Sequence, residues 1–175
     1  MANVTSLDFS NATVCLSKSV TTASGAATTL GGTNRIDYSI GGILYTKAAF
    51  SSTATPTSDY LKGTTFASVP LAINTGSVFV IALDSSSNLK CAQGTVEALD
   101  SAGNFINAPQ FPEMPTESAS FHGGSTGPVC PVCYIMVKNG ATGSAWTFGT
   151  SNWNATGATV TVKDIMALPG RPQVA

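Results

Sequence analysis

The chain has 175 residues, 10% of them charged, and a formal net charge of -1. This length suits a single domain, and the lack of a basic balance argues against binding to nucleic acid, which needs Lys and Arg along the phosphates. Average soluble proteins have roughly 25% charged residues. We therefore expect a polar, almost uncharged surface, which suits a protein that contacts neighbouring subunits.

Residues 1–33 are rich in Thr, Ser, Ala and Gly, and Val14-Cys15-Leu16 is their one compact apolar group. So few apolar side chains do not offset the entropy cost of ordering. We predict an N-terminal arm that orders on a partner, with a disordered tail as the alternative. Met1 to Phe9 contains neither a basic start nor an apolar run, so no signal peptide or membrane anchor is expected. In a reducing cytoplasm the sequons at Asn3, Asn11 and Asn154 would stay unmodified.

The clearest local pattern is a hairpin centred on Gly41-Gly42. Two glycines supply the positive φ angles of a two-residue type I′ turn. Counting outward pairs Ile40 with Ile43, Tyr38 with Tyr45 and Ile36 with Lys47. This register predicts that Ile36, Tyr38 and Ile40 share one face with Tyr45.

Residues 51–76 are rich in Ser, Thr, Pro and Gly and are predicted to be a long loop or crossover. The continuous apolar run Val78–Leu83 indicates a strand buried on both faces. A turn at 84–88 leads to a strand over 89–99, where Gly94 suggests a bulge, and the hairpin continues through the turn at 100–104 into Phe105-Ile106. Five prolines between 109 and 131 exclude regular structure there.

Two more strands are expected, over 133–138 and over 158–166, where valines alternate with polar residues. No segment has a sustained helical period of apolar residues, and none has 18 consecutive apolar residues, so we expect little helix and no membrane-spanning segment. The sequence predicts an all-β fold, a β-sandwich or a small barrel. Its N-terminal arm spans 1–33, its β core 34–166 and its extended C-terminal tail 167–175.

The pair Cys130-Pro-Val-Cys133 could hold zinc or exchange disulfides, because two thiolates at this spacing suit both roles. Zinc would need His122 and a distant Cys15 or Cys91, and the sequence has no second CxxC. A redox motif would begin a helix, whereas Pro128 precedes this pair and a strand-like run follows. Reduced, buried thiols are the first expectation, and a metal or a disulfide remains open.

No catalytic, cofactor or metal site is predicted. His122 lies in a Gly-rich loop without an orienting acid, and Glu113 and Glu117 flank Pro115, which prevents a helical pair. The cluster of Trp146, Phe148 and Trp153 is expected in the core. The alternative is a carbohydrate-binding module that would stack sugars on Trp146, Trp153 and Tyr134.

Three stretches resemble small virion structural proteins of tailed bacteriophages: Arg35–Ala48, Ser77–Asp84 and Ser151–Thr156. The resemblance implies a particle subunit of the capsid decoration or cement type, located in the virion and assembled in the host cytoplasm. Its partners would be the major capsid protein and copies of itself. A tail, neck or fibre-associated subunit is the alternative within that class, and no functional residues transfer from the resemblance.

Overall fold

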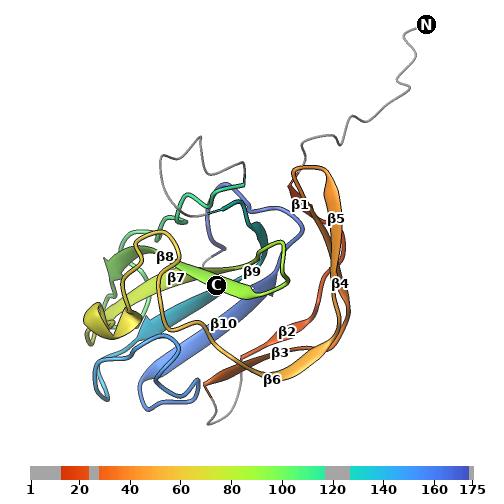
Figure 1. Ribbon diagram of the computed structural model, residues 1–175. Coiled ribbons are helices and arrows are strands. Elements are labelled where there is room, and N and C mark those ends of the chain that lie inside the picture. Colours follow the sequence, from red (N-terminus) through yellow and green to blue (C-terminus); the bar gives the residue numbers. More distant parts are fainter. Residues whose placement is uncertain (1–12, 24–27, 117–126, 174–175) are drawn as a thin grey trace, which may run out of the picture.

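The computed structural model describes residues 13–23, 28–116 and 127–173, which consist of antiparallel strands and loops (Figure 1). Within these ranges one short 3₁₀ helix, η1 (Phe66–Ser68), is the sole helical element. The predicted all-β class is confirmed, and none of the three sheets closes on itself in the described part of the chain. The strands are β1 (Val14–Cys15), β2 (Thr21–Thr22), β3 (Thr29–Gly32), β4 (Ile36–Ile40), β5 (Ile43–Lys47), β6 (Phe50–Ala54), β7 (Thr75–Leu83), β8 (Leu89–Ala98), β9 (Cys130–Asn139) and β10 (Ala158–Asp164).

One layer of the fold is a bent ribbon of three strands. Its two halves are the sheets β1-β4-β5 and β2-β3-β6. The β3–β6 pair continues the register of the β4–β5 pair. Ile40 lies opposite Ile43, and counting ten residues outward along each strand leads to Leu30 opposite Thr53. The β1–β4 and β2–β3 pairs likewise share an offset. The two small sheets are therefore successive parts of one ribbon that bends around the core, as the orange strands of Figure 1 show.

The hairpin predicted at Gly41-Gly42 is confirmed residue by residue. Ile36 lies opposite Lys47, Tyr38 opposite Tyr45 and Ile40 opposite Ile43. Both glycines have positive φ, 56° and 81°, as the turn requires. The rings of Tyr38 and Tyr45 stack with centroids 5.6 Å apart, so the large side chains do gather on the inner face.

The second layer is the sheet β10-β9-β7-β8, with β7 and β9 at its centre. The predicted central strand at 78–83 is confirmed as the middle of β7, where every residue is buried. The predicted bulge is also present, because the β7–β8 register shifts at Val78 and passes over Gly94. A Cβ atom on Gly94 would overlap the backbone carbonyl of Gln110, which explains the glycine.

Alternate side chains of β7 and β9 supply two cores. The first core lies between the layers and includes Phe79, Ile81, Leu83, Ile135 and Val137. The second lies on the outer face of the β7-β9 sheet, built on Val78, Val80, Ala82 and Tyr134. Loop segments cover it, and the side chains that pack on it from them are Tyr60, Leu61, Phe111 and Leu168.

Five aromatic side chains fill the end of the first core near η1: Phe66, Phe79, Trp146, Phe148 and Trp153. Phe79 stacks on Phe148 at 4.2 Å, and the other ring pairs of the group meet edge-on or tilted. Such pairs contribute about 0.5–1.5 kcal/mol each beyond the area they bury. The core placement expected for the two tryptophans is therefore what the structure has.

The predicted N-terminal arm overlaps the ribbon. Its described residues, 13–23 and 28–33, contain β1, β2 and β3, and Cys15 and Leu30 are buried in the first core. These strands were not predicted because they are short and have no alternating pattern of apolar side chains, and they pair here through backbone bonds. For the same reason β6 was missed, so the loop predicted over 51–76 begins only after Ala54.

Two boundaries near prolines also need correction. β9 begins at Cys130 and includes Pro131, which is tolerated because the β7–β9 register shifts there, between Ile81 and Ala82.

The predicted C-terminal tail lies, as far as residue 173, on the chain's own sheet. Leu168 packs on the second core, and the backbone N–H of Gln173 donates to the Tyr134 hydroxyl at 3.2 Å.

Candidate functional site

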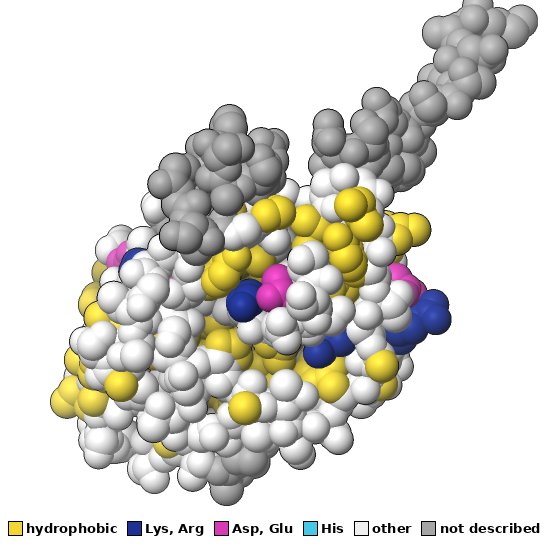
Figure 2. Space-filling model, in the orientation of Figure 1, with side chains coloured by type: hydrophobic (Ala, Val, Ile, Leu, Met, Phe, Trp, Pro, Cys, Tyr) yellow, Lys and Arg dark blue, Asp and Glu magenta, His cyan; other side chains and the backbone are white. Residues whose placement is uncertain are grey.

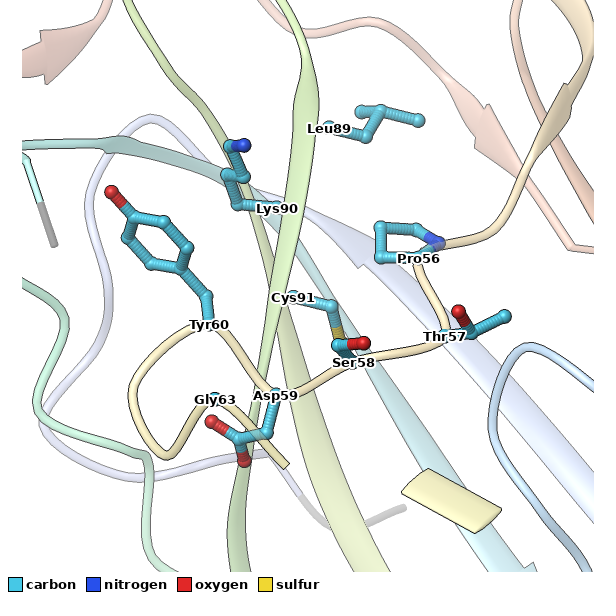
Figure 3. A pocket seen from close by; sticks show the side chains of 9 residues that line it. All are labelled: Pro56, Thr57, Ser58, Asp59, Tyr60, Gly63, Leu89, Lys90 and Cys91. Atoms are coloured by element: carbon cyan, nitrogen blue, oxygen red, sulfur yellow. The ribbon is translucent and has the colours of Figure 1, made fainter. Parts of the chain in front are cut away.

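A surface pocket of about 330 Å³ lies between the loop after β6 and the start of β8 (Figure 3). It contains the side chains most suggestive of chemistry among the described residues: an acid, a phenol, an amine and a thiol. The lining residues are Pro56, Thr57, Ser58, Asp59, Tyr60, Gly63, Leu89, Lys90 and Cys91. The partners of these groups decide what they can do.

The carboxylate of Asp59 is occupied by the backbone. Its Oδ1 accepts the N–H groups of Leu61 at 2.9 Å and Lys62 at 3.1 Å, and its Oδ2 accepts the N–H of Gln93 at 3.1 Å. The Lys62 ammonium adds a contact of 3.8 Å. Asp59 is 1% exposed. It therefore holds the loop at 58–65 against the edge of β8, and both of its oxygens are occupied by backbone donors.

The other polar groups of this pocket are also tied to the fold. The Tyr60 hydroxyl donates to the carbonyl of Gly127, and burial raises the pKa of this phenol. Lys90 pairs with Asp84 at 3.3 Å, and its ammonium lies 5.5 Å from the centroid of the Tyr60 ring. Figure 3 shows the Lys90 and Tyr60 side chains next to each other. Burial raises the pKa of the Cys91 thiol well above its ordinary value, which suppresses the reactive thiolate. The lining groups thus serve packing and loop anchoring.

The four cysteines lie in the first core as free thiols. Residues three apart in a regular strand point to opposite faces. The register shift in β9 places Cys130 and Cys133 on the same, inner face. Burial raises the pKa of each of these two thiols to about 12. Within the described ranges no three residues of the Cys, His, Asp and Glu types are grouped as a metal would require.

His122 and Glu117 lie outside the described residues, as do Asn3 and Asn11. Glu113 is exposed and Asn154 is exposed. The pocket that Glu113 lines contains none of the four cysteines, so these candidates from the sequence do not share a described pocket.

The aromatic residues do not form a sugar-stacking surface. Trp146 and Trp153 are 2% and 4% exposed, and their indole N–H groups donate to the carbonyls of Asn152 and Thr29. Tyr134 is buried in the second core against Phe111. A carbohydrate-binding module would need these three rings in the open, so that alternative is wrong for these residues.

The outer edge of β8 is covered by other parts of the chain. The N–H of Tyr60 bonds to the Cys91 carbonyl, and the Thr95 N–H bonds to the Gln110 carbonyl. Together with the Asp59–Gln93 bond, these contacts occupy the edge where a foreign strand could otherwise add.

The free edge of the ribbon is covered at one point and open at another. The Ser87 hydroxyl donates to the Thr46 carbonyl, which occupies part of β5. The tip of the hairpin is open, and there Ile43 and Leu44 are 62% and 71% exposed. Leu16 and Met166 are also exposed and lie near each other, because Cys15 beside Leu16 donates its N–H to the Met166 carbonyl. Figure 2 shows hydrophobic side chains at this end of the molecule.

We call Leu16, Ile43, Leu44 and Met166 the apolar end. The apolar end could not be predicted from the sequence, because these residue types usually lie in a core. Their exposure is seen only in the folded chain. A second exposed apolar region lies on a groove of about 580 Å³ beside β8, with Val69 and Val96 on its walls.

Comparisons with known proteins give no relative: no family model, no curated protein and no solved structure matches this chain. The described residues contain no helix of the length and hydrophobicity needed to cross a bilayer.

Proposed function

We propose that this chain is a structural virion protein, a capsid decoration or cement subunit that binds the outer surface of a phage head and stabilises it against the pressure of packaged DNA. It would act through contacts with the major capsid protein and with copies of itself. The observation that supports this most directly is the apolar end, where Ile43 and Leu44 project from the tip of a long hairpin.

Large apolar side chains exposed together mark contact sites in soluble proteins. The hairpin is a stiff support for them, because its backbone is paired from Ile36 to Lys47 and its base packs on the first core. Burial of the two side chains on a partner would contribute roughly 1.5–3 kcal/mol each. Repetition over a shell turns such modest contacts into large total stabilisation.

Charge is consistent with this role. Only 10% of the residues are charged, and the described ion pairs join groups within the chain. A contact surface with few charged groups has a small desolvation cost when it docks on a partner. It would also be insensitive to salt, unlike a contact held by surface charges.

The test is binding of the purified chain to phage heads that lack it. Replacing both tip residues, Ile43→Ser and Leu44→Ser, should weaken binding by at least tenfold and leave the thermal transition intact. The control is Val69→Ser with Val96→Ser, which removes two apolar side chains that are about half exposed, 46% and 51%, from the groove beside β8. Unchanged binding of the tip variant would refute the assignment of the contact surface.

Copy number tests the role itself. On a stained gel of purified virions a cement subunit approaches the abundance of the capsid protein, whereas a tail, neck or fibre subunit is present in few copies. Absence of the chain from virions would refute the proposal as a whole.

A further inference from the structure

Two of the buried cysteines face one small cavity. Cys15 of β1 and Cys130 at the start of β9 both line a space of about 130 Å³, closed by Thr116, Met166 and Leu168 among others. The two residues are far apart in the sequence and come from opposite layers of the fold. At this corner the layers converge, because Cα atoms of β1 and β9 approach within 8 Å.

The sheet geometry rules against the other pairings. Cys91 and Cys133 both lie opposite Ile81, on either side of β7. They are therefore two strand spacings apart, roughly 10 Å between Cα atoms. A disulfide needs a Cα separation of about 4.4–6.8 Å. Even large local motion would not join them.

The CxxC pair is poorly placed to close on itself. Cys133 lies opposite Ile81 and Cys130 opposite Leu83, so their Cα atoms are about two strand steps apart, roughly 7 Å, at the upper limit for a disulfide. Cys133 is near Cys15 as well, but it does not line the cavity, and its side chain is hydrogen-bonded to Thr21. The Sγ atom of Cys130 contacts only the carbonyl of the adjacent Pro131 among the bonds described. The shared cavity therefore favours Cys15 as the partner of Cys130.

We propose that Cys15 and Cys130 form a disulfide when the folded chain meets a small-molecule disulfide such as oxidised glutathione. One thiolate attacks the glutathione disulfide, forming a mixed disulfide and releasing one glutathione thiolate. The second thiolate then attacks the protein sulfur of the mixed disulfide and releases the other. The two cysteines lose two protons and two electrons, and oxidised glutathione gains them to become two thiols.

The reaction should be slow. Burial raises the pKa of Cys15 and raises that of Cys130 to about 12, so little thiolate is present at neutral pH. β1 is a two-residue strand at the edge of its sheet. Such short edge elements open locally at low cost. Opening of β1 would expose both thiols, and a low concentration of urea should accelerate the reaction.

The experiment uses the full reduced chain, incubated with oxidised glutathione and then alkylated and digested. We expect an intact mass lower by two hydrogens and a peptide pair that links Cys15 to Cys130. The bond should raise Tm by on the order of 10 °C, because it closes a loop of more than 100 residues. The double variant Cys91→Ser, Cys133→Ser should retain the cross-link, and Cys15→Ser should lose it.

The peptide map decides the pairing even if a variant folds poorly. A link to Cys133 or Cys91, or a stable glutathione adduct on a single cysteine, would overturn the proposal. So would the absence of any cross-link in the folded chain under conditions where the urea-unfolded chain forms disulfides. The inference concerns the free chain and is independent of its role in a virion.

Discussion

Removal of the Asp59 carboxylate should destabilise the fold more than any other single change at the surface pocket. In Asp59→Ala the N–H of Gln93 loses its acceptor in a buried position. An orphaned buried donor costs about 1–3 kcal/mol. The N–H groups of Leu61 and Lys62 are only partly buried and can reach water, so each adds about 0.5–1 kcal/mol. The expected loss is about 2–5 kcal/mol.

Asp59→Asn is the graded control. Its carbonyl oxygen can still accept from Leu61 and Lys62, but its NH₂ group must face the N–H of Gln93. The hydrogen bond from Gln93 is lost and two N–H donors face each other. We therefore expect the free energy of unfolding to fall by roughly half as much as with alanine. Lys62→Ala tests the ion pair alone. The Lys62 side chain is well exposed, so this change should cost less than about 1 kcal/mol.

The assay is urea unfolding followed by fluorescence of Trp146 and Trp153, both buried in the folded chain. The free energy of unfolding should fall in the order wild type, Lys62→Ala, Asp59→Asn, Asp59→Ala. A loss below about 0.5 kcal/mol for Asp59→Ala would refute the reasoning, because surface changes without structural role fall in that range. Asp59 would then again be a candidate for chemistry in the pocket.

Four further outcomes are expected. Asn139→Asp should lower the free energy of unfolding by about 2–4 kcal/mol, because the amide Nδ2 that it removes donates to the carbonyls of Leu71, Ala72 and Ser144; urea unfolding measures this. Gly41→Val should cost about 1–2 kcal/mol at its positive φ, and Gly41→Asn should cost less. Deletion of residues 1–12 should preserve the cooperative thermal transition, whereas deletion of 1–33 should abolish it, because β1 to β3 are removed. The free energy of unfolding should decrease as the pH is lowered below about 4. Burial alone would raise the pKa of Asp84, but hydrogen bonds from Asn88, Ser86 and Lys90 hold this pKa below its unfolded value, so the stability that the carboxylate provides is lost when it is protonated.

Each of these has an internal control. Asn139→Gln tests whether the position of the amide matters as well as its chemistry. Asp84→Asn should flatten the acid limb of the stability curve relative to the wild-type chain. The longer deletion also tests the division of the chain at residue 33 that the sequence suggested: a cooperative transition without residues 1–33 would show that the core folds without β1 to β3.

The local pattern of residues was enough to predict the hairpin, the central strand and the bulge. Gly41-Gly42 allows positive φ at two successive positions, and the flanking residues then have a single register that gathers Ile36, Tyr38 and Ile40. The run at 78–83 is apolar at every position, short and rich in β-branched residues, which is typical of a strand buried on both faces. In these cases the backbone conformation and the burial follow from nearest neighbours.

Tertiary structure decided everything that depends on partners distant in the sequence. β1, β2, β3 and β6 are short and have no alternating pattern of apolar side chains, and they are strands because the ribbon pairs them with one another and with β4 and β5. Exposure could not be predicted either: Ile43 and Leu44 resemble the buried apolar residues of β7, yet they are 62% and 71% exposed, because no described part of the chain covers the hairpin tip. The same holds for Cys15 and Cys130, which share a cavity because the two layers converge at β1.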